Sequence, residues 1–251
     1  MASDQSNTPH VITLAAVDST NAEAMRRLNA GERGPLWIRA DQQTAGRGRS
    51  GRTWTSEPGN LYASFLTSFP GGSAKAFQIS LVAGVAIHDA IRDQLGTATP
   101  ALLQVKWPND ILIGRDKTGG ILVESTTTGG KALSVIIGIG LNLVSHPADT
   151  QRPAAHLGQF GSPPLPDDML AAIHSRLTHW LAVWGMGQGF SAVREAWLER
   201  ALPIGSKIAV NGSTGPLEGL FHGLDEDGAL EISLQSGDIV TIHYGDVTLA
   251  A

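Results

Sequence analysis

Four short apolar segments separated by tight turns constrain the fold of this 251-residue chain most strongly. They run over residues 102–107, 110–113, 120–126 and 135–142, and Pro, Asn, Asp or Gly occurs in each stretch between them. Short strands spaced this closely are typical of antiparallel and mixed sheets. The middle of the chain therefore predicts such a sheet.

Helical patterns flank this region. In the first predicted helix we expect Thr20 to be the N-cap, Glu23 its capping-box partner and Gly31 the stop. The other predicted elements are strands at 11–15, 37–41 and 61–69 and helices at 77–95, 167–184 and 190–200. The expected fold class is α+β, with helices packed on a mixed β-sheet.

The chain changes character at "LPIGSK", where helical spacing gives way to short β segments. Turn signals follow at "NGSTG", "DEDG" and "QSGD". Two domains are therefore predicted, the first over residues 1–202 and a small β domain over 203–251.

Composition narrows the class of protein. A hydrophobic content of 42% is enough for one sizeable core, and a net charge of -5 argues against a general nucleic-acid binder. The chain has no cysteine, which excludes disulfides and thiolate metal sites. No signal peptide and no run of about 18 apolar residues is present. We expect a cytoplasmic protein that binds neither membrane nor nucleic acid.

One strongly cationic loop stands out in this acidic chain. The segment "QTAGRGRSGRTW" at 43–54 alternates glycines with three arginines. Glycine allows close approach of backbone N–H groups, and arginine offers fork-shaped donors that suit phosphate oxygens. The segment lacks the GK[ST] of a Walker loop, and its predicted flanks are both strands. It indicates a phosphate clamp, with a solvated hairpin turn as the alternative.

A second cluster of polar residues lies in two turns. Lys106 and Lys117 border the segments "KWPND" and "GRDKTGG", and Asn109 and Asp110 lie between them. A lysine at the end of a strand can neutralise an anionic substrate, whereas the amide and carboxylate suit a purine edge or a metal. Surface lysines and turn-capping side chains are the structural alternatives.

A third motif places two glycines inside a predicted strand. The segment "VIIGIGLNL" at 135–143 contains Gly138 and Gly140. Glycine weakens a strand, so this pattern indicates close approach of a ligand or another backbone, or else a bulge.

Six motifs in order resemble bacterial biotin protein ligases. They are "DSTN", "QTAGRGRSGRTW", "KWPNDI", "DKTGGILVE", "GIGLNL" and "GLDEDGALEI". The resemblance implies a mixed sheet with helices on one face, as in class II aminoacyl-tRNA synthetase cores, and a C-terminal Src-homology-3-like β-barrel.

The resemblance also implies the site residues. Biotin binding would involve Ser19, Thr20, Asn21, Gln43, Arg47, Gly120, Ile121 and Leu122. Nucleotide binding would involve Arg49, Arg52, Trp54, Asn109, Asp110, Lys117 and Asn142, with Asp110 also a candidate magnesium ligand. Lys117, Arg49 and Arg47 are the catalytic candidates.

The reaction implied by this resemblance has two steps. Biotin is activated by ATP and Mg²⁺ to biotinyl-5'-AMP and is then transferred to a lysine of a biotin carboxyl carrier protein domain. We expect no tightly bound prosthetic group, and either a monomer or a homodimer. Some family members begin with a winged helix-turn-helix domain, but only seventeen residues precede "DSTN" here. We therefore expect no DNA binding and no repressor function.

Three alternative functions belong to other classes. A lipoate or octanoate ligase or transferase shares the fold, although "GRGR", "GR.W" and "KWPND" fit the biotin branch better. A non-catalytic biotin sensor would not need the phosphate clamp. A nucleic-acid-binding protein would be expected to carry interleaved aromatic residues and a basic balance.

Overall fold

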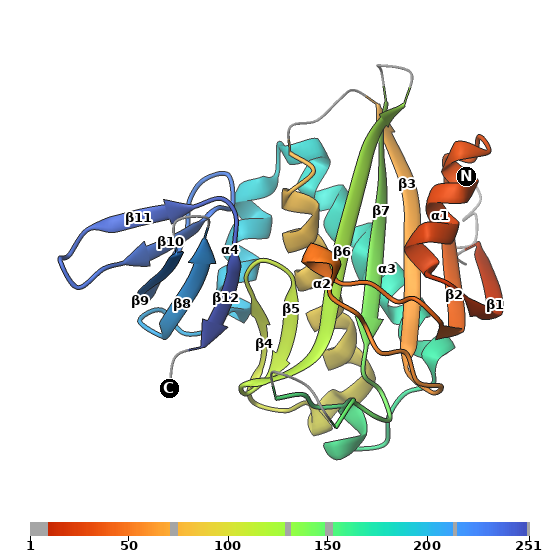
Figure 1. Ribbon diagram of the computed structural model, residues 1–251, viewed down its shortest axis with the longest axis horizontal. Coiled ribbons are helices and arrows are strands. Elements are labelled where there is room, and N and C mark those ends of the chain that lie inside the picture. The colour runs from red at the N-terminus through yellow and green to blue at the C-terminus, as the bar shows by residue number, and fades with distance from the viewer. Residues whose placement is uncertain (1–9, 71–74, 129–131, 149–152, 213–214, 250–251) are drawn as a thin grey trace, which may run out of the picture.

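The computed structural model describes residues 10–70, 75–128, 132–148, 153–212 and 215–249, and a seven-stranded mixed sheet forms its centre (Figure 1). Strand order across the sheet is β1-β2-β3-β7-β6-β5-β4. The first pair is parallel and every other neighbouring pair is antiparallel. The strands are β1 (Val11–Val17), β2 (Leu36–Gln43), β3 (Leu61–Pro70), β4 (Leu103–Lys106), β5 (Asp110–Ile113), β6 (Asp116–Thr128) and β7 (Ala132–Leu141). The expected mixed sheet is confirmed.

Helices cover both faces of this sheet, which corrects the expectation of helices on one face. Helix α1 (Thr20–Asn29) lies on one side, whereas α2 (Gln78–Leu95) and α3 (Pro166–Trp184) lie on the other (Figure 1). Successive side chains of strand β7 point to opposite faces of the sheet, so β7 packs against the helices on both faces. Ile136 packs in the small cluster under α1, and Ile137 packs in the main core with α2 and α3. Because β1 and β2 are parallel, their connection has to cross the sheet, and α1 forms that crossover.

The first helix begins one residue earlier than the sequence pattern predicts. Its N-cap is Ser19, which makes no side-chain capping bond, and the predicted capping box of Thr20 and Glu23 is wrong. The Thr20 hydroxyl lies 3.2 Å from Gln43 Oε1, and the Glu23 carboxylate pairs with Arg26 at 2.9 Å. A tertiary contact to β2 therefore takes the Thr20 hydroxyl, and an ion pair within α1 takes the Glu23 carboxylate. The predicted stop is in place, since Gly31 follows the helix with φ of 107°.

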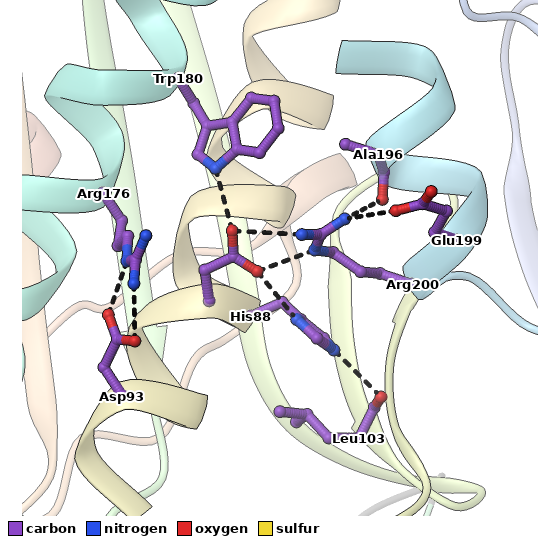
Figure 2. Close-up of polar contacts among 9 residues, drawn as sticks. His88, Asp93, Leu103, Arg176, Trp180, Ala196, Glu199 and Arg200 are labelled. Atoms are coloured by element: carbon purple, nitrogen blue, oxygen red, sulfur yellow. Dashed lines mark hydrogen bonds and ion pairs between the residues drawn. The ribbon is translucent and has the colours of Figure 1, made fainter. Parts of the chain in front are cut away.

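A partly buried ion-pair network joins three helices on the far face of the sheet. Figure 2 shows Trp180, His88 and Arg200 pointing toward one another. Their common partner is Asp89 of α2, which accepts hydrogen bonds from Trp180 Nε1 at 3.0 Å and Arg200 Nε at 2.8 Å. Burial opposes ionisation of this carboxyl, but bonds to His88 and Arg200 outweigh it and keep the pKa of Asp89 below its ordinary value. The network attaches α4 (Phe190–Arg200) to the helical layer.

The C-terminal part of the chain forms a second, five-stranded antiparallel sheet. Its order is β11-β10-β9-β8-β12, with β8 (Lys207–Gly212), β9 (Gly215–Leu224), β10 (Leu230–Ser233), β11 (Ile239–Ile242) and β12 (Asp246–Leu249). Phe221 and Val247 belong to the same continuous apolar core as the central sheet. Trp107 Nε1 donates to Gly228 O at 3.1 Å across this contact. The second sheet is therefore packed firmly against the first and can contribute to a shared site.

Candidate functional site

A cavity of about 460 Å³ opens where the start of α1, the arginine-rich loop, strands β5 to β7 and the start of β12 meet. All the site residues named from the sequence line this one cavity. They are Ser19, Thr20, Asn21, Gln43, Arg47, Arg49, Arg52, Trp54, Asn109, Asp110, Lys117, Gly120, Ile121, Leu122 and Asn142. The structure thus brings together segments that are up to about half the chain apart in sequence.

One end of the cavity carries uncharged hydrogen-bonding groups. Gln43 Oε1 accepts from the Thr20 backbone N–H at 2.9 Å, and Gln43 Nε2 donates to Ser56 Oγ at 3.1 Å. A primary amide has two N–H donors, so Gln43 keeps one for a ligand. Ser19, with its side chain at the cavity wall, adds a hydroxyl that can donate or accept. These groups suit a ligand with both N–H donors and a carbonyl acceptor.

Asn21 is fixed at the same end by three bonds. Its Nδ2 donates to Glu124 Oε2 at 2.7 Å and to Leu122 O at 3.2 Å, while its Oδ1 accepts from Ser64 Oγ at 2.6 Å. Both amide hydrogens are used within the protein. The second lone pair of Oδ1 is what Asn21 can offer to a ligand N–H.

The two glycines of the β7 motif are explained by close side-chain packing. A Cβ at Gly138 would come within 2.1 Å of Asn21 Oδ1, and a Cβ at Gly140 would come within 2.5 Å of Trp54 Cε2. Neither approach is compatible with any larger residue. Of the explanations left open by the sequence, a bulge is excluded, because β7 keeps an unbroken register with β3 and β6 at these positions.

Trp54 forms an aromatic wall over the middle of the cavity. Its ring lies beside Gly140, and Lys117 Nζ stands 5.4 Å from the ring centroid. Within the part of the chain that the structure describes, the buried indole Nε1 has no hydrogen-bond partner. A buried N–H without a partner is costly, so a ligand acceptor at this point would be favoured.

A buried carboxylate anchors two lysines at the other end. Asp110 Oδ1 is 2.5 Å from Lys117 Nζ, and Asp110 Oδ2 is 2.7 Å from Lys106 Nζ. Burial of Asp110 opposes its ionisation, but the two ammonium groups outweigh it and lower its pKa to about 2. Lys106 also donates to Val247 O at 2.7 Å. Lys117 is more exposed than Lys106, so it is the cation that faces the cavity.

The arginine-rich loop is held in a folded shape over this end. An isolated bridge joins Arg47 to Thr53, and Ser50 takes a left-handed conformation with φ of 54°. Arg49 Nη1 donates to Asn109 Oδ1 at 3.4 Å, and burial lowers the pKa of Arg49 from its ordinary value. Arg47 extends away from this group, and its Nη2 lies 3.9 Å from Glu124. The loop therefore presents Arg49 to the cationic end and Arg47 to the uncharged end.

Asp246 is a site residue that the sequence did not indicate. It forms ion pairs with Arg49, at 3.4 Å, and with Arg52, and Arg49 Nη2 also donates to Gly245 O at 3.2 Å. A single aspartate in a β-rich domain carries no motif, so only the tertiary contact between the two sheets identifies it. Asp246 places the C-terminal domain directly at the arginine loop.

Further residues that were not among the site residues named from the sequence also contact the cavity or its lining. Gly48, Thr53, Thr55, Gly138, Ile139, Gly140, Pro147 and Ala154 line it, and Ser64 and Glu124 lie behind Asn21. Asn142, which was indicated, donates to Ala155 O at 3.0 Å and so connects β7 to the segment that follows it. Gly138 and Gly140 stand in the strand motif that indicated close packing, and Glu124 ends the segment "DKTGGILVE". The sequence assigned no role to Glu124, however, and did not point to Ser64.

Two family models match the chain. The biotin/lipoate A/B protein ligase family matches residues 14–142, and the biotin protein ligase C terminal domain matches residues 204–249. The biotin–acetyl-CoA-carboxylase ligase of Paracoccus denitrificans is 38% identical over 223 residues, which cover 86% of this chain and 91% of that protein. The chain belongs to the biotin/lipoate A/B protein ligase family.

Other relatives of this ligase-family chain extend over nearly its whole length. The biotin–acetyl-CoA-carboxylase ligase of Mycobacterium tuberculosis is 28% identical and covers 93% of the chain, and the chain covers 86% of that protein. A solved structure of the Aquifex aeolicus biotin protein ligase in complex with biotin and ATP superposes with a TM-score of 0.78 at 27% identity, over 97% of this chain and 99% of that one. The expected α+β fold class, with its small C-terminal β domain, is confirmed.

The acidic residues of this ligase-family chain do not form a metal site among the described residues. No three His, Asp or Glu side chains gather there in a suitable arrangement. Both oxygens of Asp110 are already paired with ammonium groups, which does not suit a magnesium ligand. Within the same described ranges, the helices are all too short or too polar to span a lipid bilayer.

Proposed function

We propose that this chain is an ATP-dependent biotin protein ligase, which forms biotinyl-5'-AMP and transfers biotin to a lysine of a carrier protein. The observation that carries the proposal is a single cavity with two chemically different ends. An uncharged hydrogen-bonding end, with Gln43 and Asn21, faces a cationic end, with Lys117 and Arg49. A molecule with a polar, neutral ring and a carboxylate tail fits that polarity, and a volume of about 460 Å³ is within the range of small-ligand sites.

The uncharged end is suited to the ureido ring of biotin. Gln43 would donate its remaining N–H to the ring carbonyl, and Asn21 Oδ1 would accept from a ring N–H. The apolar strand around Ile121 would pack against the bicyclic ring, and Trp54 would cover it from the loop side. These assignments place the biotin carboxylate toward Lys117.

The first step requires two anions to meet at the cationic end. A biotin carboxylate oxygen attacks the α-phosphorus of ATP, the bond from that phosphorus to its bridging oxygen breaks, and pyrophosphate leaves. Lys117 and Arg49 would offset the repulsion between carboxylate and triphosphate and stabilise charge on the α-phosphate oxygens. Asp110 holds Lys117 in position for this role. Asn109 and Asn142 would contact the nucleotide from the ends of the turns that carry them.

The second step consumes the adenylate. The amine of an acceptor lysine attacks the acyl carbon, the carbon–oxygen bond to AMP breaks, and the amine loses a proton as the amide forms. The arginine loop, folded over the cavity, would keep water from the mixed anhydride. A biotin carboxyl carrier protein domain is the acceptor that the family relationship supports, and the cytoplasm is the compartment in which such an acceptor is made.

Magnesium would be held by oxygens of the triphosphate, not by Asp110, because both oxygens of Asp110 are paired with ammonium groups. Its contribution when bound would be to neutralise phosphate charge. Residues 1–202 would form the catalytic domain and 203–251 the β domain that completes it through Asp246.

The test is transfer of labelled biotin to a purified carrier domain with ATP and Mg²⁺. Lys117→Ala and Arg49→Ala are each expected to lower the rate by about 100-fold, as for loss of one charge-stabilising donor. Lys207→Ala is the matched control, since Lys207 is an exposed lysine of β8. Release of pyrophosphate is measured in parallel, and its absence with biotin in the wild type contradicts the proposal.

Lipoate and octanoate are included as competing substrates in the same assay. The uncharged hydrogen-bonding end would have no partner in either molecule, because both have apolar tails. We therefore expect activity with biotin alone. Faster pyrophosphate release with octanoate or lipoate would assign the chain to the other branch of the family.

A further inference from the structure

Glu124 of β6 lies outside the cavity lining but contacts two residues that form it. Its Oε2 accepts from Asn21 Nδ2 at 2.7 Å, and its Oε1 lies 3.9 Å from Arg47 Nη2. The Glu124 side chain is 31% exposed and the Arg47 side chain is 51% exposed. The carboxylate therefore connects the first turn of α1 with the arginine-rich loop that covers the cavity.

The first contact determines which way the Asn21 amide points. With Nδ2 toward Glu124 and Leu122 O, Oδ1 lies against Ser64 Oγ and keeps one lone pair for the cavity. Rotating the amide by half a turn would place its oxygen against a carboxylate and a carbonyl, and both contacts would be repulsive. Glu124 thus selects the orientation in which Asn21 is an acceptor.

The close packing of Asn21 makes this orientation a requirement. Gly138 leaves so little room that a Cβ there would lie 2.1 Å from Asn21 Oδ1. The amide is therefore confined to its plane, and its two ends differ only in hydrogen bonding. Asn21 is 4% exposed, so water cannot freely replace Glu124 as the acceptor of the bond from Asn21 Nδ2.

The second contact is the weaker one. An ion pair at 3.9 Å between two partly exposed side chains contributes little, because water screens both charges. It draws Arg47 toward the uncharged end without fixing it. The bond to Asn21 is shorter, more buried and charge-assisted, so it is the stronger of the two.

We propose that Glu124 is a positioning residue for ligand recognition: it holds the Asn21 amide as a hydrogen-bond acceptor for a ring N–H of the substrate. The inference rests on the proposed function, because biotin is the ligand whose ureido N–H would be accepted. The contact of Glu124 with Arg47 contributes less to this role than the bond from Asn21. The role concerns binding, so the chemical step at Lys117 should be unaffected.

Two variants of Glu124 separate orientation of Asn21 from attraction of Arg47. Glu124→Gln keeps an oxygen that can accept from Asn21 Nδ2 but removes the charge. Glu124→Ala removes both. We expect Glu124→Ala to raise the dissociation constant for biotin, measured by calorimetry, by about 10-fold, and Glu124→Gln to raise it by less than about 3-fold. Glu195→Ala, at an exposed position of α4, is the matched control.

The kinetic result should follow the binding result. Glu124→Ala is expected to raise KM for biotin while kcat at saturating biotin stays within about 2-fold of the wild type. In an Asn21→Ala background, adding Glu124→Ala should have no further effect on biotin affinity, because Glu124 acts through Asn21. A merely structural role would lower kcat or thermal stability in both backgrounds alike.

Three outcomes overturn the inference in distinguishable ways. If Glu124→Ala binds biotin with the wild-type dissociation constant, Glu124 has no positioning role. A Glu124→Gln protein as weak as Glu124→Ala assigns the effect to charge and Arg47 instead of Asn21. If the wild type itself shows no binding of biotin and no pyrophosphate release with it, the proposed function fails first and the inference fails with it.

Discussion

Replacement of the buried carboxylate Asp110 by asparagine should destabilise the protein measurably. Asp110 is 6% exposed and holds Lys106 and Lys117 at 2.7 and 2.5 Å. Its pKa falls from an ordinary 3.8 to about 2 in the folded protein, which corresponds to roughly 2 kcal/mol of favourable interaction with the ionised form. Removing one partner from a buried ion pair generally costs about 3–5 kcal/mol.

Both figures lead us to expect Asp110→Asn to lower the free energy of unfolding by about 3 kcal/mol. For a protein of this size, each kcal/mol lowers Tm by about 2–4 °C, so a decrease of about 6–12 °C is expected. Thermal unfolding followed by circular dichroism at pH 7 measures it. Asp93→Asn is the matched control, since Asp93 pairs with Arg176 at the surface and both side chains are about 40% exposed. An exposed pair contributes less than about 1 kcal/mol.

The reasoning fails if Asp110→Asn and Asp93→Asn have the same Tm. The same reasoning gives a second prediction, because the ammonium groups of Lys106 and Lys117 repel each other once the carboxylate is lost. Adding Lys106→Met to Asp110→Asn should then recover part of the lost stability. A double variant that is less stable than Asp110→Asn would show that Lys106 contributes mainly through Val247 O, to which it donates at 2.7 Å.

Three further predictions concern the loop, the cavity wall and pH. Gly140→Ala would place a Cβ 2.5 Å from Trp54 Cε2, so biotin-dependent pyrophosphate release should fall at least about 10-fold, and unchanged release would contradict this packing. Asp246→Asn removes the ion pairs of Arg49 and Arg52, so trypsin should cleave at these two arginines several-fold faster in the ligand-free protein; equal rates would refute it. His174 Nδ1 accepts from Trp37 Nε1 at 3.1 Å, and burial lowers the pKa of His174 below 6.5. In the unfolded chain His174 has its ordinary pKa, so it becomes protonated at a higher pH than in the folded protein. The free energy of unfolding should therefore fall as pH decreases below about 6.5. Urea unfolding at pH 8 and pH 5.5 should show a smaller difference in His174→Gln than in the wild type.

Much of this protein could be predicted from local sequence because its elements are specified by local chemistry. Turn residues such as those in "KWPND" and the apolar spacing of residues 135–142 are properties of short windows, and the mixed sheet followed from them. The glycine and arginine alternation at 46–52 indicated a ligand loop for the same reason. The error at the start of the first helix was not local: the Thr20 hydroxyl has partners in β2 and β3, so it does not form the predicted capping box.

The residues that the sequence did not indicate act across long separations. Asp246 contacts Arg49 from the second sheet, Glu124 orients Asn21 from β6, and Ser64 supports it from β3. Asp246 and Ser64 stand in no motif, and Glu124, although it ends the segment "DKTGGILVE", has the same local preferences there as a glutamate in any strand. The sequence by itself determined the elements, the loop and the types of group that line the cavity. Only the tertiary structure decided which carboxylate holds each cation and amide, because that choice depends on distances between strands far apart in the chain.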